Sequence, residues 1–360
     1  MSECQMERRD FIAGGACAAV GLAAGCVSAR QPQFTAADPL RAVYLSLGRN
    51  MWGVWRAPDE PKADGVRYAN ENLEFSEVNW RKLVDRAVER KYNMVVMDLG
   101  EFVRYPSVPE LSVEGSWEPD RLRAEIRRLR GLGLEPIPKL NFSAAHDAWL
   151  KEYSRMHATQ TYYRVCDRLI GDVAEIFDTP RFIHIGWDEE RFKNFRNLPI
   201  VSCRQGEMWW HDFLWFVKTV ERHSMRPWIW SDYGWHHDEF VSRCPKSVLQ
   251  SNWYYDDDLT GFDPNDPKNH FKCILDLYVA LDKAGFDQVP CGSNWVSPIR
   301  KKAGVGNRDS MGKLIRYCRE RISAERLKGF LMAPWAGLET EKGFRHNLEG
   351  IDLMADGLEA

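Results

Sequence analysis

The feature that most constrains this chain is a regular alternation of short apolar runs with longer amphipathic stretches. The apolar runs have the length and bounding residues of buried strands. A strand followed by a helix, repeated along the chain, is typical of parallel βα units. We therefore predict eight β-strands, at residues 42–47, 94–99, 135–141, 182–187, 227–231, 248–253, 288–294 and 329–334.

Between these strands, apolar residues recur at three- and four-residue spacing, which predicts amphipathic helices. The first opens with Ser76 as a plausible N-cap and the second carries Pro119 in its first turn. The connection at 238–243 is short and gives the weakest helix. The predicted helices span residues 76–90, 119–132, 161–177, 206–222, 269–284, 310–322 and 344–358.

No repeat or Pro/Ser-rich linker divides the 360-residue chain after its N-terminal segment. The remaining length suits one (β/α)₈ barrel. We therefore predict an α/β protein with a single TIM barrel, forming one catalytic domain over residues 40–360.

Residues 1–29 are predicted to be an export signal. Arg8-Arg9-Asp10-Phe11-Ile12 resembles the twin-arginine motif, and the apolar run 11–22 is too short to span a bilayer. Val27-Ser28-Ala29 offers a signal peptidase site, whereas Leu22-Ala23-Ala24-Gly25-Cys26 resembles a lipobox. Both cleavages stay open. Either way we expect a bacterial periplasmic or envelope-anchored protein, which would contact membrane only through a lipid on Cys26.

Composition narrows the choice of partner. A net charge of −3 without any basic block argues against nucleic-acid binding. The 15 tryptophans favour a carbohydrate ligand, because indole rings stack on the apolar faces of sugars. Some of them are expected in the core: Trp209, Trp210 and Trp215 lie at helical spacing.

Metal and cofactor chemistry is not expected. No cysteine pair has the CxxC spacing of a zinc site, and adjacent histidines such as His236-His237 rarely bind one ion together. The cysteines after the signal could form disulfides in an oxidising compartment or remain buried thiols. The sequence leaves this choice and the oligomeric state open.

Polar and aromatic residues collect where the predicted strands end. In (β/α)₈ barrels the chemistry lies at the carboxyl ends of the strands, so these residues should converge on one site. Carboxylates and arginine bind sugar hydroxyls and rings stack on the pyranose, which together predict a carbohydrate site. The strand-end candidates are Arg49, Asp98, Glu101, His146, Asp188, Glu189, Asp232, Trp253, Tyr254, Trp295, Trp335 and Glu339.

One segment carries a resemblance to a known family. Residues 182–190, Phe-Ile-His-Ile-Gly-Trp-Asp-Glu-Glu, resemble the His-x-Gly-Gly-Asp-Glu signature of family 20 glycoside hydrolases, the β-N-acetylhexosaminidases, with Trp187 in place of the second glycine. The segments 47–51 and 137–142 resemble the first and third strands of that family. Trp228 to Trp235, Trp253, and Trp335 with Glu339 resemble its pocket tryptophans and terminal Trp/Glu.

The resemblance implies substrate-assisted retaining catalysis on N-acetylhexosamine-containing glycans. The substrate's own 2-acetamido oxygen would attack the anomeric carbon. Asp188 would orient the acetamido group, and Glu189, buried beside Trp187, would be the acid and base. Further substrate contacts are assigned to Arg49 on sugar hydroxyls, to His184 in the motif and to an apolar cage of Trp228, Trp230, Trp253 and Trp335.

Two departures keep other functions open. Lys139 and Asn141 replace acidic residues of the family's third strand, which weakens a proton relay through His146. The seventh strand lacks the family's tyrosine, for which Tyr254 or Tyr255 could substitute. The alternatives are a glycosidase with two separated carboxylates, Glu189 with Asp98 or Asp232, and an inactive sugar-binding envelope lipoprotein.

Overall fold

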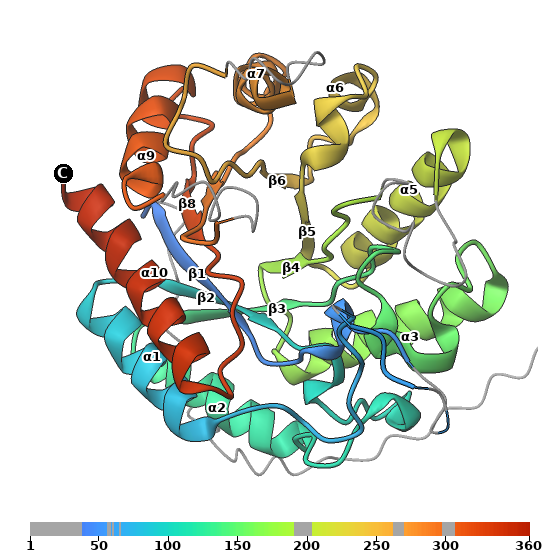
Figure 1. Cartoon of the computed structure of the whole chain (residues 1–360). Coiled ribbons are helices and arrows are strands. Elements are labelled where there is room, and N and C mark those ends of the chain that lie inside the picture. The colour runs from blue at the N-terminus through green and yellow to red at the C-terminus, as the bar shows by residue number, and fades with distance from the viewer. Residues whose placement is uncertain are drawn as a thin grey trace, which may run out of the picture. The chain divides into compact units, whose positions relative to one another are not determined.

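Eight parallel strands form the centre of the computed structural model (Figure 1). They are β1 (Leu40–Ser46), β2 (Met94–Asp98), β3 (Glu135–Lys139), β4 (Phe182–His184), β5 (Arg226–Trp230), β6 (Leu249–Ser251), β7 (Cys291–Gly292) and β8 (Gly329–Met332). The structure describes residues 38–55, 59, 61–64, 66–190, 204–261, 270–296 and 307–360. The predicted export signal, residues 1–29, lies outside the described residues.

The strands pair in the order β6-β5-β4-β3-β2-β1-β8-β7. Every pair is parallel, and the register sets Ser46 opposite Asp98 and Lys139 opposite His184. Parallel bridges from Gln250 to Gln288 and from Trp253 to Cys291 join β6 to the β7 segment and close the ring. The single (β/α)₈ barrel predicted from the sequence is confirmed.

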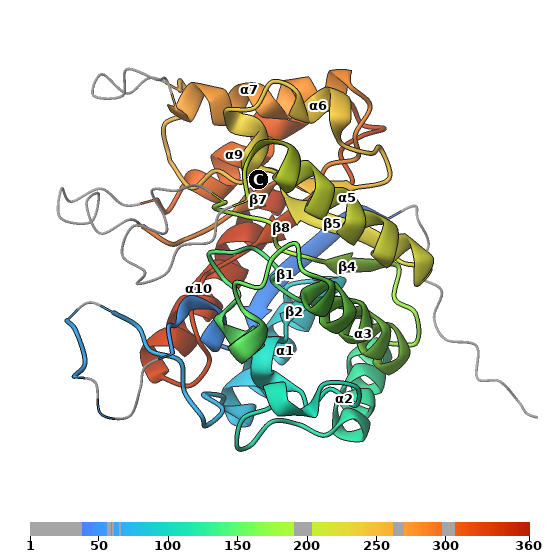
Figure 2. The same ribbon diagram turned by 90° about the vertical axis from the view of Figure 1, so that its right-hand side faces the viewer.

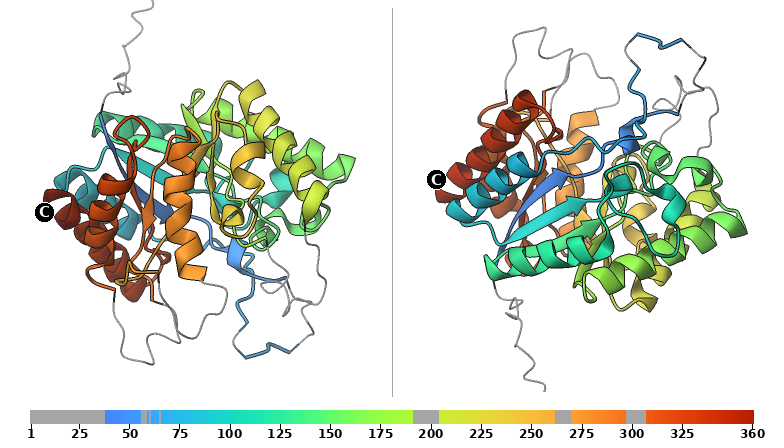
Figure 3. Two further views of the ribbon diagram at one scale, coloured as in Figure 1. Left: turned by 90° about the horizontal axis from the view of Figure 1, so that it is seen from above. Right: turned by 90° about the horizontal axis from the view of Figure 1, so that it is seen from below.

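Helices surround the strands on the outside (Figures 2 and 3). Ser76 caps the first helix by accepting a hydrogen bond from the Asn79 backbone N–H, as predicted. The last helix packs against the first, where Arg86 and Asp352 form an ion pair of 2.8 Å. The helices are α1 (Glu77–Glu89), α2 (Pro119–Gly131), α3 (Gln160–Ile176), α5 (Gly206–Arg222), α6 (Phe240–Arg243), α7 (His270–Lys283), α9 (Ser310–Arg321) and α10 (Glu341–Glu359).

Short 3₁₀ turns follow several strands and shape the mouth of the barrel. They span η1 (Asn50–Trp52), η2 (Gly100–Phe102), η3 (Pro109–Leu111), η4 (Ala148–Tyr153) and η5 (Asp232–Trp235). Six strands, β2, β3, β4, β6, β7 and β8, are shorter than predicted; among them β4 ends at His184, and β7 has only two residues. In β4 the cause is the backbone, because Gly186 and Trp187 both have positive φ.

The core explains part of the tryptophan content. Trp209 and Trp210 are fully buried, and Trp209 stacks on Tyr233 with ring centroids 3.7 Å apart, as the helical spacing predicted. Trp215 stacks on Tyr163. Cys166, Cys244, Cys291 and Cys318 are buried thiols that form no disulfide with another described cysteine. None of the described helices is long and apolar enough to cross a membrane.

Candidate active site

A pocket of about 340 Å³ opens at the carboxyl ends of the strands. Its lining residues lie at the end of β5 and after β1, β3, β4, β6, β7 and β8, so strand ends far apart in sequence do converge as predicted. Both acidic residues of the resemblance motif are among them. The lining residues are Arg49, Trp52, His146, Asp188, Glu189, Trp230, Trp253, Tyr255, Trp295 and Trp335.

The backbone after β4 turns the two acidic residues toward this pocket. Gly186, Trp187 and Glu189 have φ of 75°, 77° and 58°, so the chain leaves strand geometry at once. A Cβ on Gly186 would lie 2.0 Å from Asn141 Oδ1, so only glycine fits there. The indole of Trp187 packs in the core against Phe216, and side chains on either side of it no longer alternate as in a strand.

The Asp188 carboxylate is buried and held by polar partners. Asn141 Nδ2 donates a 3.1 Å hydrogen bond to Oδ1, and His146 Nε2 lies 3.3 Å from Oδ2. Burial alone would raise the pKa of Asp188. The charges of His146 and Lys139 and the hydrogen bonds from His146 and Asn141 outweigh that effect and hold the pKa well below its usual range. Asp188 is therefore ionised at neutral pH.

His146 bridges the two adjacent carboxylates. Its Nε2 lies 3.3 Å from Asp188 Oδ2 and 3.2 Å from Glu189 Oε2. Burial lowers the pKa of the imidazole, but the charge of Asp188 and hydrogen bonds to both carboxylates raise it to about 10. His146 is thus a cation at neutral pH. It reaches Asp188 and Glu189 even though the chain lacks the third-strand acid of the resembled family.

Glu189 has a different environment from Asp188. Its side chain is 43% exposed at the pocket, and its backbone N–H donates a 3.0 Å hydrogen bond to Asp232 Oδ2. The burial beside Trp187 that we expected is not found, because the positive φ values direct the Trp187 indole into the core. Glu189 is the more accessible of the two carboxylates.

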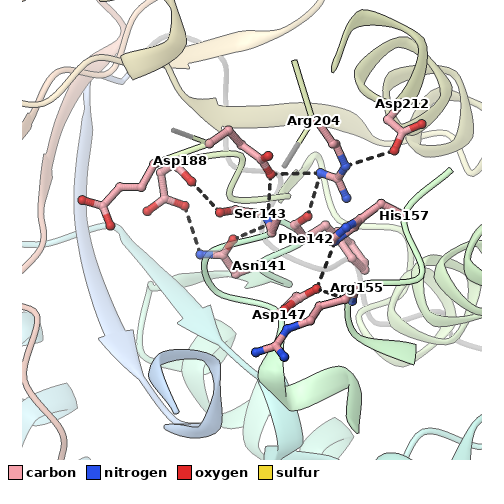
Figure 4. Close-up of polar contacts among 12 residues, drawn as sticks. Asn141, Phe142, Ser143, Asp147, Arg155, His157, Asp188, Arg204 and Asp212 are labelled. Atoms are coloured by element: carbon pink, nitrogen blue, oxygen red, sulfur yellow. Dashed lines mark hydrogen bonds and ion pairs between the residues drawn. The ribbon is translucent and has the colours of Figure 1, made fainter. Parts of the chain in front are cut away.

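A buried ionic network fixes the chain just after Glu189 (Figure 4). Glu190 accepts a 2.6 Å hydrogen bond from the Ala144 backbone N–H and pairs with Arg204 at 3.1 Å. Arg204 also pairs with Asp212 of α5 at 3.0 Å, and its guanidinium lies 4.4 Å from the centre of the Trp187 ring. The third acidic residue of the Asp-Glu-Glu run is therefore a structural anchor.

Across the pocket, Arg49 is held by two carboxylates. Its Nη1 pairs with Glu339 at 2.9 Å, and its backbone N–H donates a 2.6 Å hydrogen bond to Glu101 Oε1. Glu101 is fully buried and also accepts the Asn50 N–H at 2.9 Å. Burial raises the pKa of Glu101 above its usual value, although these backbone hydrogen bonds offset part of the rise. Glu101 thus shapes the loop that presents Arg49, without lining the pocket.

Aromatic rings form most of the remaining lining. Trp335, with φ of 57°, donates from Nε1 to the Tyr255 hydroxyl at 3.0 Å. Trp253 stacks on Tyr255 with centroids 5.0 Å apart, and Trp230 meets Trp335 edge-on at 5.4 Å. Trp295 is 42% exposed at the rim.

Several predicted site residues lie deeper than the pocket or beside it. Asp98 forms a buried ion pair with Lys139 at 2.5 Å and accepts from Tyr44 at 2.8 Å. His184 and Trp228 are buried in the barrel, 5.4 Å apart between ring centroids. Burial and the charge of Lys139 lower the pKa of His184 well below its ordinary value, so it is neutral.

The other three lie beside the pocket. Asp232 lines a separate cavity of about 50 Å³ behind the Glu189 backbone. Tyr254 donates to the Asp258 carbonyl and lines a neighbouring cavity. Glu339 faces the groove beyond Arg49.

Trp52 lines the pocket but was not among the sequence candidates, and Tyr255 lines it where the sequence had left Tyr254 and Tyr255 as alternatives. Trp52 lies in the 3₁₀ turn that follows Arg49. A search for the first polar residues after each predicted strand therefore does not include it. Tyr255 was the alternative to Tyr254, and its position one residue further along decides that it faces the pocket. Among the described residues, no group of three or more His, Cys, Asp or Glu is placed to hold a metal ion.

Many solved structures match the fold of this chain, whereas no family model and no curated protein matches the sequence. A β-N-acetylhexosaminidase from Bacteroides fragilis superimposes with a TM-score of 0.57 at 14% identity, over 88% of this chain and 65% of that one. An exo-β-N-acetylglucosaminidase of family 20 from Vibrio harveyi, in complex with N-acetylglucosamine, gives 0.53 at 14%, over 88% and 54%.

An N-acetyl-β-hexosaminidase from Streptomyces plicatus gives a TM-score of 0.53 at 13% identity, over 88% of this chain and 64% of that one. This chain therefore spans about two thirds or less of the length of these three proteins. At such identities the likeness establishes the barrel fold, and function must be argued from the site.

Proposed function

We propose that this protein is a glycoside hydrolase that cleaves 2-acetamido sugars from glycans by substrate-assisted, retaining catalysis. The observation that carries the proposal is the pair Asp188 and Glu189: two adjacent carboxylates in one aromatic pocket, the first ionised and held, the second accessible. Pairs of carboxylates in contrasting environments are how such sites divide their roles. The solved structures of similar fold are hexosaminidases, which agrees with this chemistry.

The first step forms a ring within the substrate. The acetamido oxygen attacks the anomeric carbon as the bond to the leaving oxygen breaks, and Glu189 gives that oxygen its proton. Positive charge develops on the acetamido group, and the ionised Asp188 stabilises it through the N–H. The Tyr255 hydroxyl, which accepts a hydrogen bond from Trp335, would donate to the acetamido oxygen.

The second step restores the enzyme. Glu189, now a carboxylate, takes a proton from water, and the water oxygen opens the oxazolinium ring at the anomeric carbon with overall retention of configuration. The His146 cation, 3.2 Å from Glu189, stabilises the carboxylate between the two steps. The indoles of Trp230, Trp253 and Trp335 exclude water from the acetamido methyl.

The two-carboxylate alternative has less support. It needs a second carboxylate facing the sugar together with Glu189. Asp98 is paired with Lys139 below the pocket, and Asp232 accepts the backbone N–H of Glu189 and lines a separate cavity. Neither lines the pocket that contains Glu189.

A screen of aryl glycosides tests the proposed function. Wild type should release the aryl group from β-glycosides that carry a 2-acetamido group, and Glu189→Gln should bind them without turnover. Cleavage of the 2-hydroxy glycosides at an equal rate would favour two carboxylates. Binding without cleavage by wild type would instead identify a sugar-binding protein.

We also propose that residues 1–29 direct export of the protein to the periplasm or the envelope, with or without a lipid on Cys26.

A further inference from the structure

A second, larger cavity begins where the candidate active site ends. This groove has a volume of about 970 Å³, against about 340 Å³ for the pocket. Arg49, Trp295 and Trp335 line both, so the two spaces meet at these three side chains. Beyond them the groove is lined by the loop after β8 and the first turns of α10, including Lys342, Arg345 and Glu349.

The strand order places this groove across the barrel mouth from the acid. In the ring β6-β5-β4-β3-β2-β1-β8-β7, strands β4 and β8 lie four positions apart in either direction. Asp188 and Glu189 follow β4, whereas the groove lies over the ends of β1, β7 and β8. A group that Glu189 protonates must lie on the β4 side. The groove therefore faces a part of the substrate other than the leaving group.

The chemistry of the groove suits a sugar. Trp295, 42% exposed at the junction, offers an indole face for stacking on a pyranose ring. The rim carries charges of both signs, Lys342 and Arg345 with Glu349, which supply donors and acceptors for hydroxyl groups. The carboxylates of Glu339 and Glu349 would repel a phosphate or sulfate, so this mixed lining favours an uncharged sugar over an anion.

We propose that the groove binds a further sugar unit attached to the 2-acetamido sugar on the side away from the cleaved bond. The enzyme then accepts an acetamido sugar that is itself substituted, and it releases a disaccharide or longer product instead of a single hexosamine. This inference rests on the proposed function and specifies its substrate class.

Binding and cleavage together test it. The ligands are N-acetylglucosamine and disaccharides in which a second hexose is linked to O3, O4 or O6 of N-acetylglucosamine, with their aryl β-glycosides. Calorimetry on wild type should show at least tenfold tighter binding of one disaccharide than of the monosaccharide, and its aryl glycoside should release the intact disaccharide. Lys342→Trp, which fills the groove from an exposed position, should abolish the gain. Lys218→Trp, exposed on α5, should retain it.

The outcomes separate the two proposals. If the aryl monosaccharide is cleaved but no disaccharide binds more tightly, the groove proposal is wrong and the proposed function stands. A gain that survives in Lys342→Trp places the second sugar elsewhere and also overturns the groove proposal. If no sugar binds and no aryl glycoside is cleaved, both proposals are wrong.

Discussion

The two sides of the barrel mouth are built on different principles. On the β3–β4 side, His146 lies within hydrogen-bond reach of both Asp188 and Glu189, whose segment is fixed by positive-φ backbone and a buried ionic network. On the β8–β1 side, Trp335 and Arg49 face the same pocket, and Glu339 holds Arg49 from the neighbouring groove. The first side concentrates charge where bonds would change, and the second offers rings and hydroxyl partners that would hold a sugar. Changes on the first side should therefore lower kcat, and changes on the second should raise KM.

The largest effect should come from Glu189. Glu189→Gln removes the transferable proton but keeps the shape of the side chain, and we expect kcat to fall by roughly 10²–10⁴-fold with little change in substrate binding. Steady-state kinetics with an aryl 2-acetamido glycoside measure this. Retention of wild-type turnover would remove Glu189 from the mechanism.

Removal of Arg204 from the buried ionic network on the β3–β4 side should destabilise the protein. Arg204→Met leaves Glu190 and Asp212 buried without the arginine that both pair with, and we expect the free energy of unfolding to fall by about 3–5 kcal/mol. Arg243→Met is the matched control, because its pair with Glu207 is exposed and is worth less than about 1 kcal/mol. If denaturant unfolding shows the same loss of unfolding free energy in both variants, the buried network stabilises the protein no more than an exposed ion pair does.

The charge on His146 gives the β3–β4 side a pH dependence in the alkaline range. Its folded-state pKa of about 10 exceeds the ordinary value of 6.5. Its contribution to stability is therefore complete below about pH 6.5 and is lost as the pH rises toward 10. Between pH 7 and 10, wild type should lose roughly 3–4 kcal/mol more stability than His146→Gln. Parallel pH profiles for the two proteins would contradict a charged His146.

The β8–β1 side should give the smallest effect. Glu339→Gln weakens the hold on Arg49 without touching the reacting atoms, and we expect KM to rise about tenfold with kcat nearly unchanged, a loss of about 1.4 kcal/mol. Glu341→Gln, an exposed neighbour that pairs with Arg345, should behave as wild type. A fall in kcat equal to that of Glu189→Gln would place Glu339 among the reacting groups and erase the contrast between the two sides.

The sequence predicted the barrel and most of the pocket because both follow from periodicity. Apolar runs and helical spacing locate the strands, and strand ends locate Arg49, His146, Asp188 and Trp335. How deeply a side chain lies below the mouth of the barrel is harder to predict from the sequence. Asp98 and Lys139 lie opposite each other in adjacent strands, and only this register reveals that Asp98 is neutralised in the core.

Residues with positive φ account for other differences between the predicted and the observed site. Three positive-φ residues within four positions end β4 early, bury Trp187 and expose Glu189. Only the glycine among them is visible in the sequence as a signal for such a turn. Tyr255 and Tyr254 are likewise indistinguishable until the chain direction after β6 is known.

In the proposed mechanism the substrate's own acetamido group is the nucleophile, and Asp188 stabilises its cyclised form. A thiazoline analogue, shaped and charged like that intermediate, tests it by inhibition of wild type and Asp188→Ala. We expect wild type to bind the analogue at least about 10²-fold more tightly than N-acetylglucosamine, because an enzyme is most complementary to the transition state. Asp188→Ala should lose most of this preference. Equal binding of the analogue and the simple sugar to wild type would contradict it.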